Sequence, residues 1–144
     1  MTRKFSIALL LFALTTLACV VPASAAISPT NVQRLKDECS DVVEITISEV
    51  TVKETVSEFF HSRTEVVYVA KVTAVKRSKS DVKVGDEIEF QSYFLKGAPP
   101  PGPRSPKLLA KGWKGSVFLK KTAEDKFKIG VFGHSFDAKK DSTK

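Results

Sequence analysis

Residues 64–77 read TEVVYVAKVTAVKR and decide the fold class, because β-branched side chains dominate this stretch. Alternate residues of an extended strand share one face, and in the first half of this stretch both faces are apolar. Such a pattern predicts a long strand that is central in its sheet or covered on both sides. The first face carries Val66, Tyr68, Ala70, Val72 and Ala74, and the second carries Val67, Val69 and Val75.

Four more stretches predict strands around this one. The stretch that begins at Val43 alternates apolar and polar residues until its apolar phase slips to Val50 and Val52. A slip of this kind predicts a β-bulge. Gly130 and Gly133, inside the last stretch, predict bending or a close approach of the backbone. The remaining predicted strands are 86–94, 116–122 and 127–136, and a hairpin turn at 123–125 joins the last two.

A short helix is predicted before the first strand. Ser28 can cap its N-terminus, and Pro29 suits the first helical position. Val32, Leu35 and Cys39 follow at helical spacing and form one apolar stripe that would pack on a core. We therefore expect Cys39 to face inward as a buried thiol. A reactive thiol or an intermolecular bridge is the alternative.

Five strands, one short helix and no strand–helix–strand spacing predict a mainly β fold. The pattern favours a small five-stranded OB-like Greek-key barrel, and a β-sandwich is the alternative. The length of 144 residues fits a single domain. We place this domain at residues 26–136 and a polar tail at 137–144.

Residues 1–25 have the composition of a secretory signal peptide. Arg3 and Lys4 precede an uncharged apolar stretch, and the small residues Ala23-Ser24-Ala25 end it. The sequence thus predicts a secreted or periplasmic protein that has no membrane span after cleavage. The alternative is a lipid anchor at Cys19. Cleavage would leave Cys39 as the one cysteine, so no intrachain disulfide is expected.

Three short motifs lie in and between the predicted strands: Ala70-Lys71-Val72, Val84-Gly85-Asp86 and the stretch 112–119. Together they resemble a bacterial secreted domain of the netrin-like type, which includes the tissue inhibitors of metalloproteinases. The resemblance covers roughly half of the expected mature chain and implies an OB-like barrel with an inhibitor-like binding role. Those inhibitors insert a disulfide-tethered N-terminal cysteine into a protease zinc site. The expected N-terminus here, Ala26 or Ile27, has no such cysteine, so the inhibitory residues are not carried over.

The stretch 97–106 reads GAPPPGPRSP and carries five of the seven prolines, which excludes a helix interior or a central strand. It predicts a stiff, polyproline-like loop. Rigid loops and aromatic anchors lose little entropy on binding. We therefore expect an exported, non-enzymatic module that binds a protein partner. The expected contact residues are Tyr93, Pro100, Pro101, Pro103, Arg104 and Trp113.

Two other functions stay open. The formal charge of +7 suggests a polyanion binder, although export argues against nucleic acid as the partner. A small hydrolase could be centred on His134, beside Ser135 and Asp137, but in a strand the first two would point to opposite faces. No spacing resembles a metal-ligand motif, so neither an enzyme nor a metal or cofactor is expected. The polyanion residues would be Lys76, Arg77, Lys120, Lys121, Lys126 and Lys128.

Overall fold

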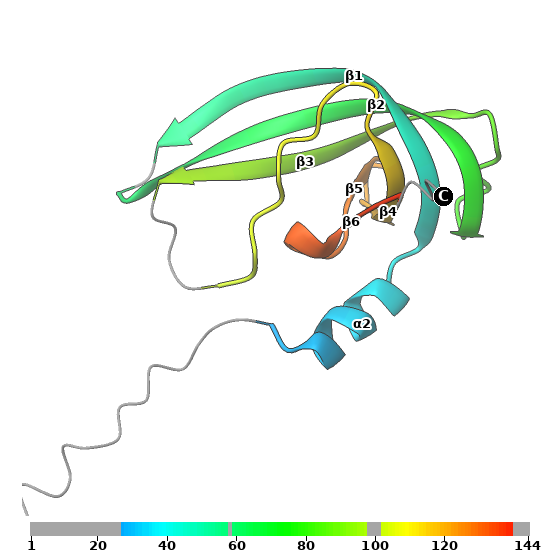
Figure 1. Ribbon diagram of the computed structural model, residues 1–144, viewed down its shortest axis with the longest axis horizontal. Coiled ribbons are helices and arrows are strands. Elements are labelled where there is room, and N and C mark those ends of the chain that lie inside the picture. Colours follow the sequence, from blue (N-terminus) through cyan, green and yellow to red (C-terminus); the bar gives the residue numbers. More distant parts are fainter. Residues whose placement is uncertain (1–26, 58, 98–101, 140–144) are drawn as a thin grey trace, which may run out of the picture.

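The computed structural model describes residues 27–57, 59–97 and 102–139. These residues form a mainly β structure with one short α-helix beside it (Figure 1). The predicted signal peptide and the alternative lipid site at Cys19 lie outside the described residues. No helix in the described ranges combines the length and the apolar character needed to cross a membrane.

The helix and the strands follow the predicted order. Ser28 caps the helix by accepting a hydrogen bond from the Asn31 amide at 3.3 Å, as its position before Pro29 predicts. The elements are α2 (Pro29–Asp37), β1 (Asp41–Ser57), β2 (His61–Ser78), β3 (Glu87–Gly97), β4 (Lys114–Lys121), β5 (Phe127–Ile129), the 3₁₀ turn η1 (Phe132–His134) and β6 (Phe136–Ala138).

The sheet closes into a ring because β1 has two neighbours. The strand order is β1-β2-β3-β5-β4, and β4 pairs again with β1. Every pairing in the ring is antiparallel except the parallel contact between β3 and β5. This ring is the small five-stranded barrel that the sequence predicts, and β6 is a sixth strand along β4.

Bulges in β1 allow this double pairing. Its register against β2 shifts at four places, and one shift, between Ile47 and Glu49, lies where the apolar phase of the sequence slips. The predicted bulge is therefore confirmed. Each bulge increases the local twist and bend of the strand. Residues 41–46 of β1 thus pair with β4 on one edge, while the whole length of the strand pairs with β2 on the other edge.

β2 is the central strand that its two apolar faces predict, with β1 on one side and β3 on the other. The rings of Tyr68 and Phe90 pack inside the barrel with their centres 5.2 Å apart. The buried core consists of Val43, Ile45, Ile47, Val66, Tyr68, Ala70, Val72, Ile88, Phe90, Val117 and Leu119.

The prediction of one continuous strand over residues 127–136 is wrong. β5 ends at Ile129, and the chain turns through η1 before β6 begins. Phe132 has a φ of 47°, which breaks an extended strand, and the Val131 amide donates to Ser135 Oγ at 2.8 Å to hold the turn. Asp137, assigned from the sequence to the polar tail, pairs with Ser116 of β4.

Cys39 is the buried thiol that the helical stripe predicts. Its side chain is 1% exposed, and its Sγ donates to the Leu35 carbonyl at 3.2 Å. Burial raises the pKa of this thiol, so the unreactive protonated form dominates. A Cβ on Gly130 would collide with this Sγ, which confirms the predicted close approach of the backbone at that glycine.

Asp41 ties the start of β1 to the end of β2. Its buried carboxylate accepts hydrogen bonds from the hydroxyls of Ser78 at 2.7 Å and Ser80 at 2.9 Å, and from the Ser80 amide at 3.2 Å. Burial acts to raise the pKa of Asp41, but the hydrogen bonds from Ser40, Ser78 and Ser80 outweigh it and lower that pKa below its ordinary value.

The Asp41→Asn substitution tests this network. We expect it to lower the free energy of unfolding at neutral pH by about 1–3 kcal/mol, because buried hydroxyls lose a charged acceptor. The folded-state pKa lies below the unfolded value of about 3.9, so this stability is present above that pH and is lost as pH falls through the folded pKa.

Urea unfolding at neutral and acidic pH checks the expectation. The difference between wild type and Asp41→Asn should shrink as the pH drops below about 4. Asp125→Asn, at a carboxylate whose side chain is 83% exposed, is the matched control. Equal stability of wild type and Asp41→Asn at neutral pH would contradict the assigned role.

Candidate functional site

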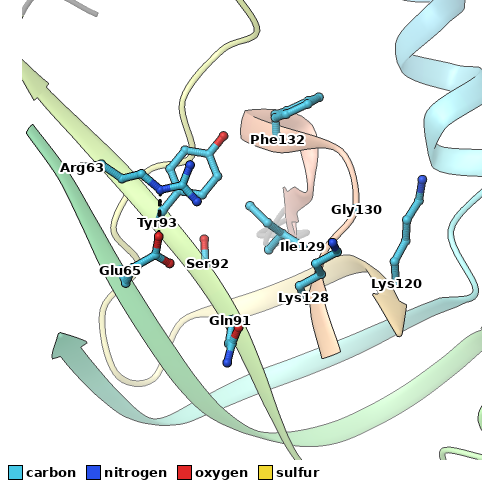
Figure 2. Close-up of a pocket in the computed structure, with 10 residues that line it drawn as sticks. All are labelled: Arg63, Glu65, Gln91, Ser92, Tyr93, Lys120, Lys128, Ile129, Gly130 and Phe132. Carbon is cyan, nitrogen blue, oxygen red and sulfur yellow. Dashed lines mark hydrogen bonds and ion pairs between the residues drawn. The ribbon is translucent and has the colours of Figure 1, made fainter. Parts of the chain in front are cut away.

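Three surface features are candidates for binding. The Trp113 cleft has a volume of about 280 Å³ and is lined by Arg104, Ser105, Lys107, Leu109, Trp113, Gly133, Phe136 and Ala138. The Tyr93 cleft has a volume of about 380 Å³ and is lined by Arg63, Glu65, Gln91, Ser92, Tyr93, Lys120, Lys128, Ile129, Gly130 and Phe132 (Figure 2). The hairpin tip, where β1 meets β2, carries Val52, Val56, Phe59 and Phe60.

Trp113 packs against the barrel core and also lines a cleft. Its indole packs edge-on against Phe136, with ring centres 5.9 Å apart, and it covers Gly115 so closely that a Cβ there would strike the indole. Its carbonyl accepts a hydrogen bond from the Ile47 amide at 3.0 Å. Removing this side chain would therefore disturb packing at the end of the barrel.

The described part of the proline-rich loop is held to the barrel at several points. The Leu109 amide donates to the hydroxyl of the core residue Tyr68 at 3.0 Å. Gly133 donates to the Arg104 carbonyl at 2.7 Å. Ser105 Oγ accepts from the Leu95 amide at 3.1 Å. These bonds fix residues 104 and 105 of the loop, and Leu109 beyond it, to the rest of the structure. The stiffness of the whole loop stays a prediction.

The contact residues predicted from the sequence lie in two different clefts, and some lie outside the described residues. Arg104 and Trp113 line one cleft, as expected, whereas Tyr93 lines the other. Pro103 is exposed on the loop. Pro100 and Pro101 lie outside the described residues, so their place relative to Trp113 stays a prediction.

The Tyr93 cleft is rich in positive charge. The Arg63 guanidinium stacks 4.1 Å from the centre of the Tyr93 ring, and its Nε donates to Glu65 at 2.7 Å. Burial raises the pKa of Tyr93, and the Arg63 charge lowers it by less. Lys120 lies 3.8 Å from Glu38, at the limit of an ion pair, and Lys128 pairs with no acid among the described residues.

Ser92 is an unusual member of this cleft. It follows Ile88 and Phe90 in the buried register of β3 and is 3% exposed. Its Oγ has no hydrogen-bond partner within the described chain. A buried polar group without a partner costs about 1–3 kcal/mol, so such groups are rare in folded proteins.

Four of the six basic residues of the polyanion hypothesis lie on the β4–β5 hairpin, but only two of the six line a cleft. Lys120 and Lys128 share the Tyr93 cleft, and the other four are engaged elsewhere. Lys76 contacts Ser116 Oγ at 2.8 Å and Glu44 at 3.4 Å, Arg77 donates to the Lys36 carbonyl at 2.6 Å, Lys121 pairs with Asp125, and Lys126 pairs with Glu124 at 3.3 Å.

The trio around His134 does not form a catalytic arrangement. His134 lies in η1 and not in the predicted strand. The Ser135 hydroxyl is fully buried and accepts from the Val131 amide. Asp137 pairs with Lys36 at 2.9 Å. A nucleophile needs a base within hydrogen-bond reach, and these contacts supply none.

The hairpin tip was missed in the sequence. Phe59 is fully exposed and Phe60 is 78% exposed, whereas Tyr68, the one Phe, Tyr or Trp residue of the two adjoining strands, is buried. The available signal was the adjacent pair of phenylalanines at the point where one strand pattern ends and the next begins. Aromatic residues at such a turn have no core to fill.

Comparison of the chain with protein-family models and with curated proteins finds no match. Among the described residues, no group of three His, Cys, Asp or Glu side chains is placed to hold a metal ion. The function is therefore inferred from the surfaces of the molecule.

Two buried serines allow a matched test of the unpartnered hydroxyl. Ser135→Ala should lower the free energy of unfolding by about 1–3 kcal/mol, because the Val131 amide loses its acceptor. Ser92→Ala should leave stability unchanged or raise it, because no hydrogen bond within the chain is lost. Chemical denaturation of both variants gives their free energies of unfolding and tests these two expectations. A loss at Ser92 equal to that at Ser135 would show that its hydroxyl is satisfied in solution.

Proposed function

We propose that this chain is an exported, non-enzymatic binding module that holds a protein partner through its hairpin tip. The observation that carries the proposal is the exposure of Phe59 and Phe60, at 100% and 78%, together with Val52 and Val56, which are each more than half exposed. Large apolar side chains that are exposed near one end of a hairpin are typical of interaction sites in folded proteins. Aromatic side chains contribute strongly to binding energy at such sites.

The tip is braced, which favours binding. β2 and β3 stay paired up to His61 and Gly97, the last pair beside the tip. Gly97 approaches so closely that a Cβ on it would lie 2.7 Å from the Phe60 carbonyl oxygen. A hairpin end held in this way loses little entropy when a partner covers it.

The charges near the tip favour a protein over an anionic membrane. Lys53 and Glu54 lie on β1 close to the turn, and on β2 Arg63 pairs with Glu65 at 2.7 Å. Membrane surfaces and polyanions attract clusters of positive charge, whereas mixed charge around an apolar centre is typical of protein interfaces.

The netrin-like resemblance supports an inhibitor-like form of this binding. An OB-like barrel with a projecting, rigid aromatic hairpin can occlude a site on a partner without reacting with it. The described residues offer no catalytic arrangement around His134 that would favour an enzyme instead. The predicted signal peptide supports export.

The double substitution Phe59→Ser/Phe60→Ser tests the proposal. Immobilised wild-type chain should capture a partner from extracts of its source, and the variant should lose at least about tenfold of that capture, because two aromatic anchors are removed. Val84→Ser is the matched control, since Val84 is 65% exposed. It lies on the connection between β2 and β3, at the opposite end of the molecule from the tip (Figure 1).

Capture through an apolar tip should persist at about 1 M salt, where surface charge is screened beyond about 3 Å. Capture that disappears with salt, or that is equal in all variants, would contradict the proposal. Trp113→Ala is a poor test, because the indole packs against Phe136 and its loss would disturb the barrel.

A further inference from the structure

The Tyr93 cleft lies where the barrel wall has its shortest pairing. β3 and β5 are joined by only two residue pairs, Phe90 with Phe127 and Gln91 with Lys128. Beyond them β3 continues to Gly97, whereas β5 ends at Ile129, and the residues that follow on each side line the cleft (Figure 2). The cleft therefore spans an opening in the wall of the barrel.

Positive charge at this opening exceeds negative charge. Arg63, Lys120 and Lys128 face the cleft, and Glu65 is its one carboxylate. Glu65 already accepts from Arg63 Nε, while both Nη atoms of Arg63 make no hydrogen bond to a described residue. Stacking on Tyr93 and the bond to Glu65 thus fix the guanidinium and leave its outer donors available.

The cleft also contains the Ser92 hydroxyl, a hydrogen-bond donor that has no acceptor among the described residues. Ser92 is only 3% exposed, and its Oγ has no partner in the described chain. Figure 2 shows this hydroxyl on the side of β3 that faces Ile129, at the opening between the two strands. Its position adds an independent sign that a polar group from outside the chain completes the site.

The remaining wall is apolar. Phe132, 39% exposed, stands on η1 above the opening, and Ile129 and Tyr93 lie below and beside it (Figure 2). A cleft of about 380 Å³ is in the size range of small-molecule sites. Flat aromatic walls beside fixed cations suit a ligand that combines a planar apolar body with a charged end.

We propose that the Tyr93 cleft binds a small organic anion: a flat apolar body with a phosphate or carboxylate group. Arg63 and Lys128 hold the anionic oxygens, Phe132 and Tyr93 contact the body, and the Ser92 hydroxyl donates to the most deeply placed oxygen. The cleft contains none of the four tip residues Val52, Val56, Phe59 and Phe60, although its Arg63 lies close to the tip. The two sites can therefore be tested with different variants.

The test is a titration of the full chain followed by amide NMR shifts at about 0.15 M salt, where distant surface charges are screened. The probes are phenyl phosphate, benzoate, inorganic phosphate and benzyl alcohol. Phenyl phosphate or benzoate should give saturable shifts at residues 91–93 and 128–132. At least one should bind about tenfold more tightly than inorganic phosphate, which lacks the body, or benzyl alcohol, which lacks the charge.

Two lysines of the same hairpin provide matched variants. Lys128→Gln should weaken binding of the organic anion about fivefold or more, because Lys128 lines the cleft. Lys126→Gln should leave it unchanged, because Lys126 pairs with Glu124 and does not line the cleft. Ser92→Ala should weaken binding while the variant stays folded.

Three results would overturn the proposal. They are the absence of saturable shifts, binding of inorganic phosphate as tight as that of the organic anions, and equal weakening by Lys126→Gln and Lys128→Gln, which would indicate diffuse attraction to a basic surface. Loss of anion binding with capture at the hairpin tip intact separates this site from the proposed function.

Discussion

The structure depends on the pairing of β1 with β4, because this pairing closes the sheet into a ring. β1 pairs with β2 along its whole length and with β4 through residues 41–46, and this second pairing closes the sheet. A flat sheet cannot close on itself, so the strand that joins its two ends has to bend. The bulges of β1 supply the bend, and Asp41 fixes the start of the strand to the end of β2. Without this closure the core would be open on one side.

The uneven pairing around the ring accounts for the two surfaces that we propose as binding sites. Beyond Ile47, β1 has β2 as its one strand partner, so the hairpin extends past the barrel and has little core to cover. Val52 and Val56 of β1 consequently remain at the surface. On the other side of the ring, β3 and β5 part after two pairs and leave the opening that the Tyr93 cleft spans. Both surfaces follow from where the strands stop pairing.

Much of the fold could be predicted from periodicity, and the binding surfaces could not. The two apolar faces of β2, the phase slip in β1 and the cap at Ser28 each determine local structure, and the structure confirms them. The end of β5 was misread because positive φ at Phe132 leaves no mark in an apolar pattern. Tyr93 and Trp113 were assigned to one surface because both border the same loop in sequence. The paths of β3 and of the loop carry them to different clefts.

Cys39 packs beneath the backbone of Gly130, on the corner where α2 leads into β1. No reagent or second thiol can reach this sulfur while that corner stays closed, because a glycine backbone and a neighbouring turn of helix fill the approach. Chemical modification of the cysteine would thus accumulate only in molecules whose corner has opened. The extent of modification of the Cys39 sulfur would therefore measure how often this corner of the protein opens.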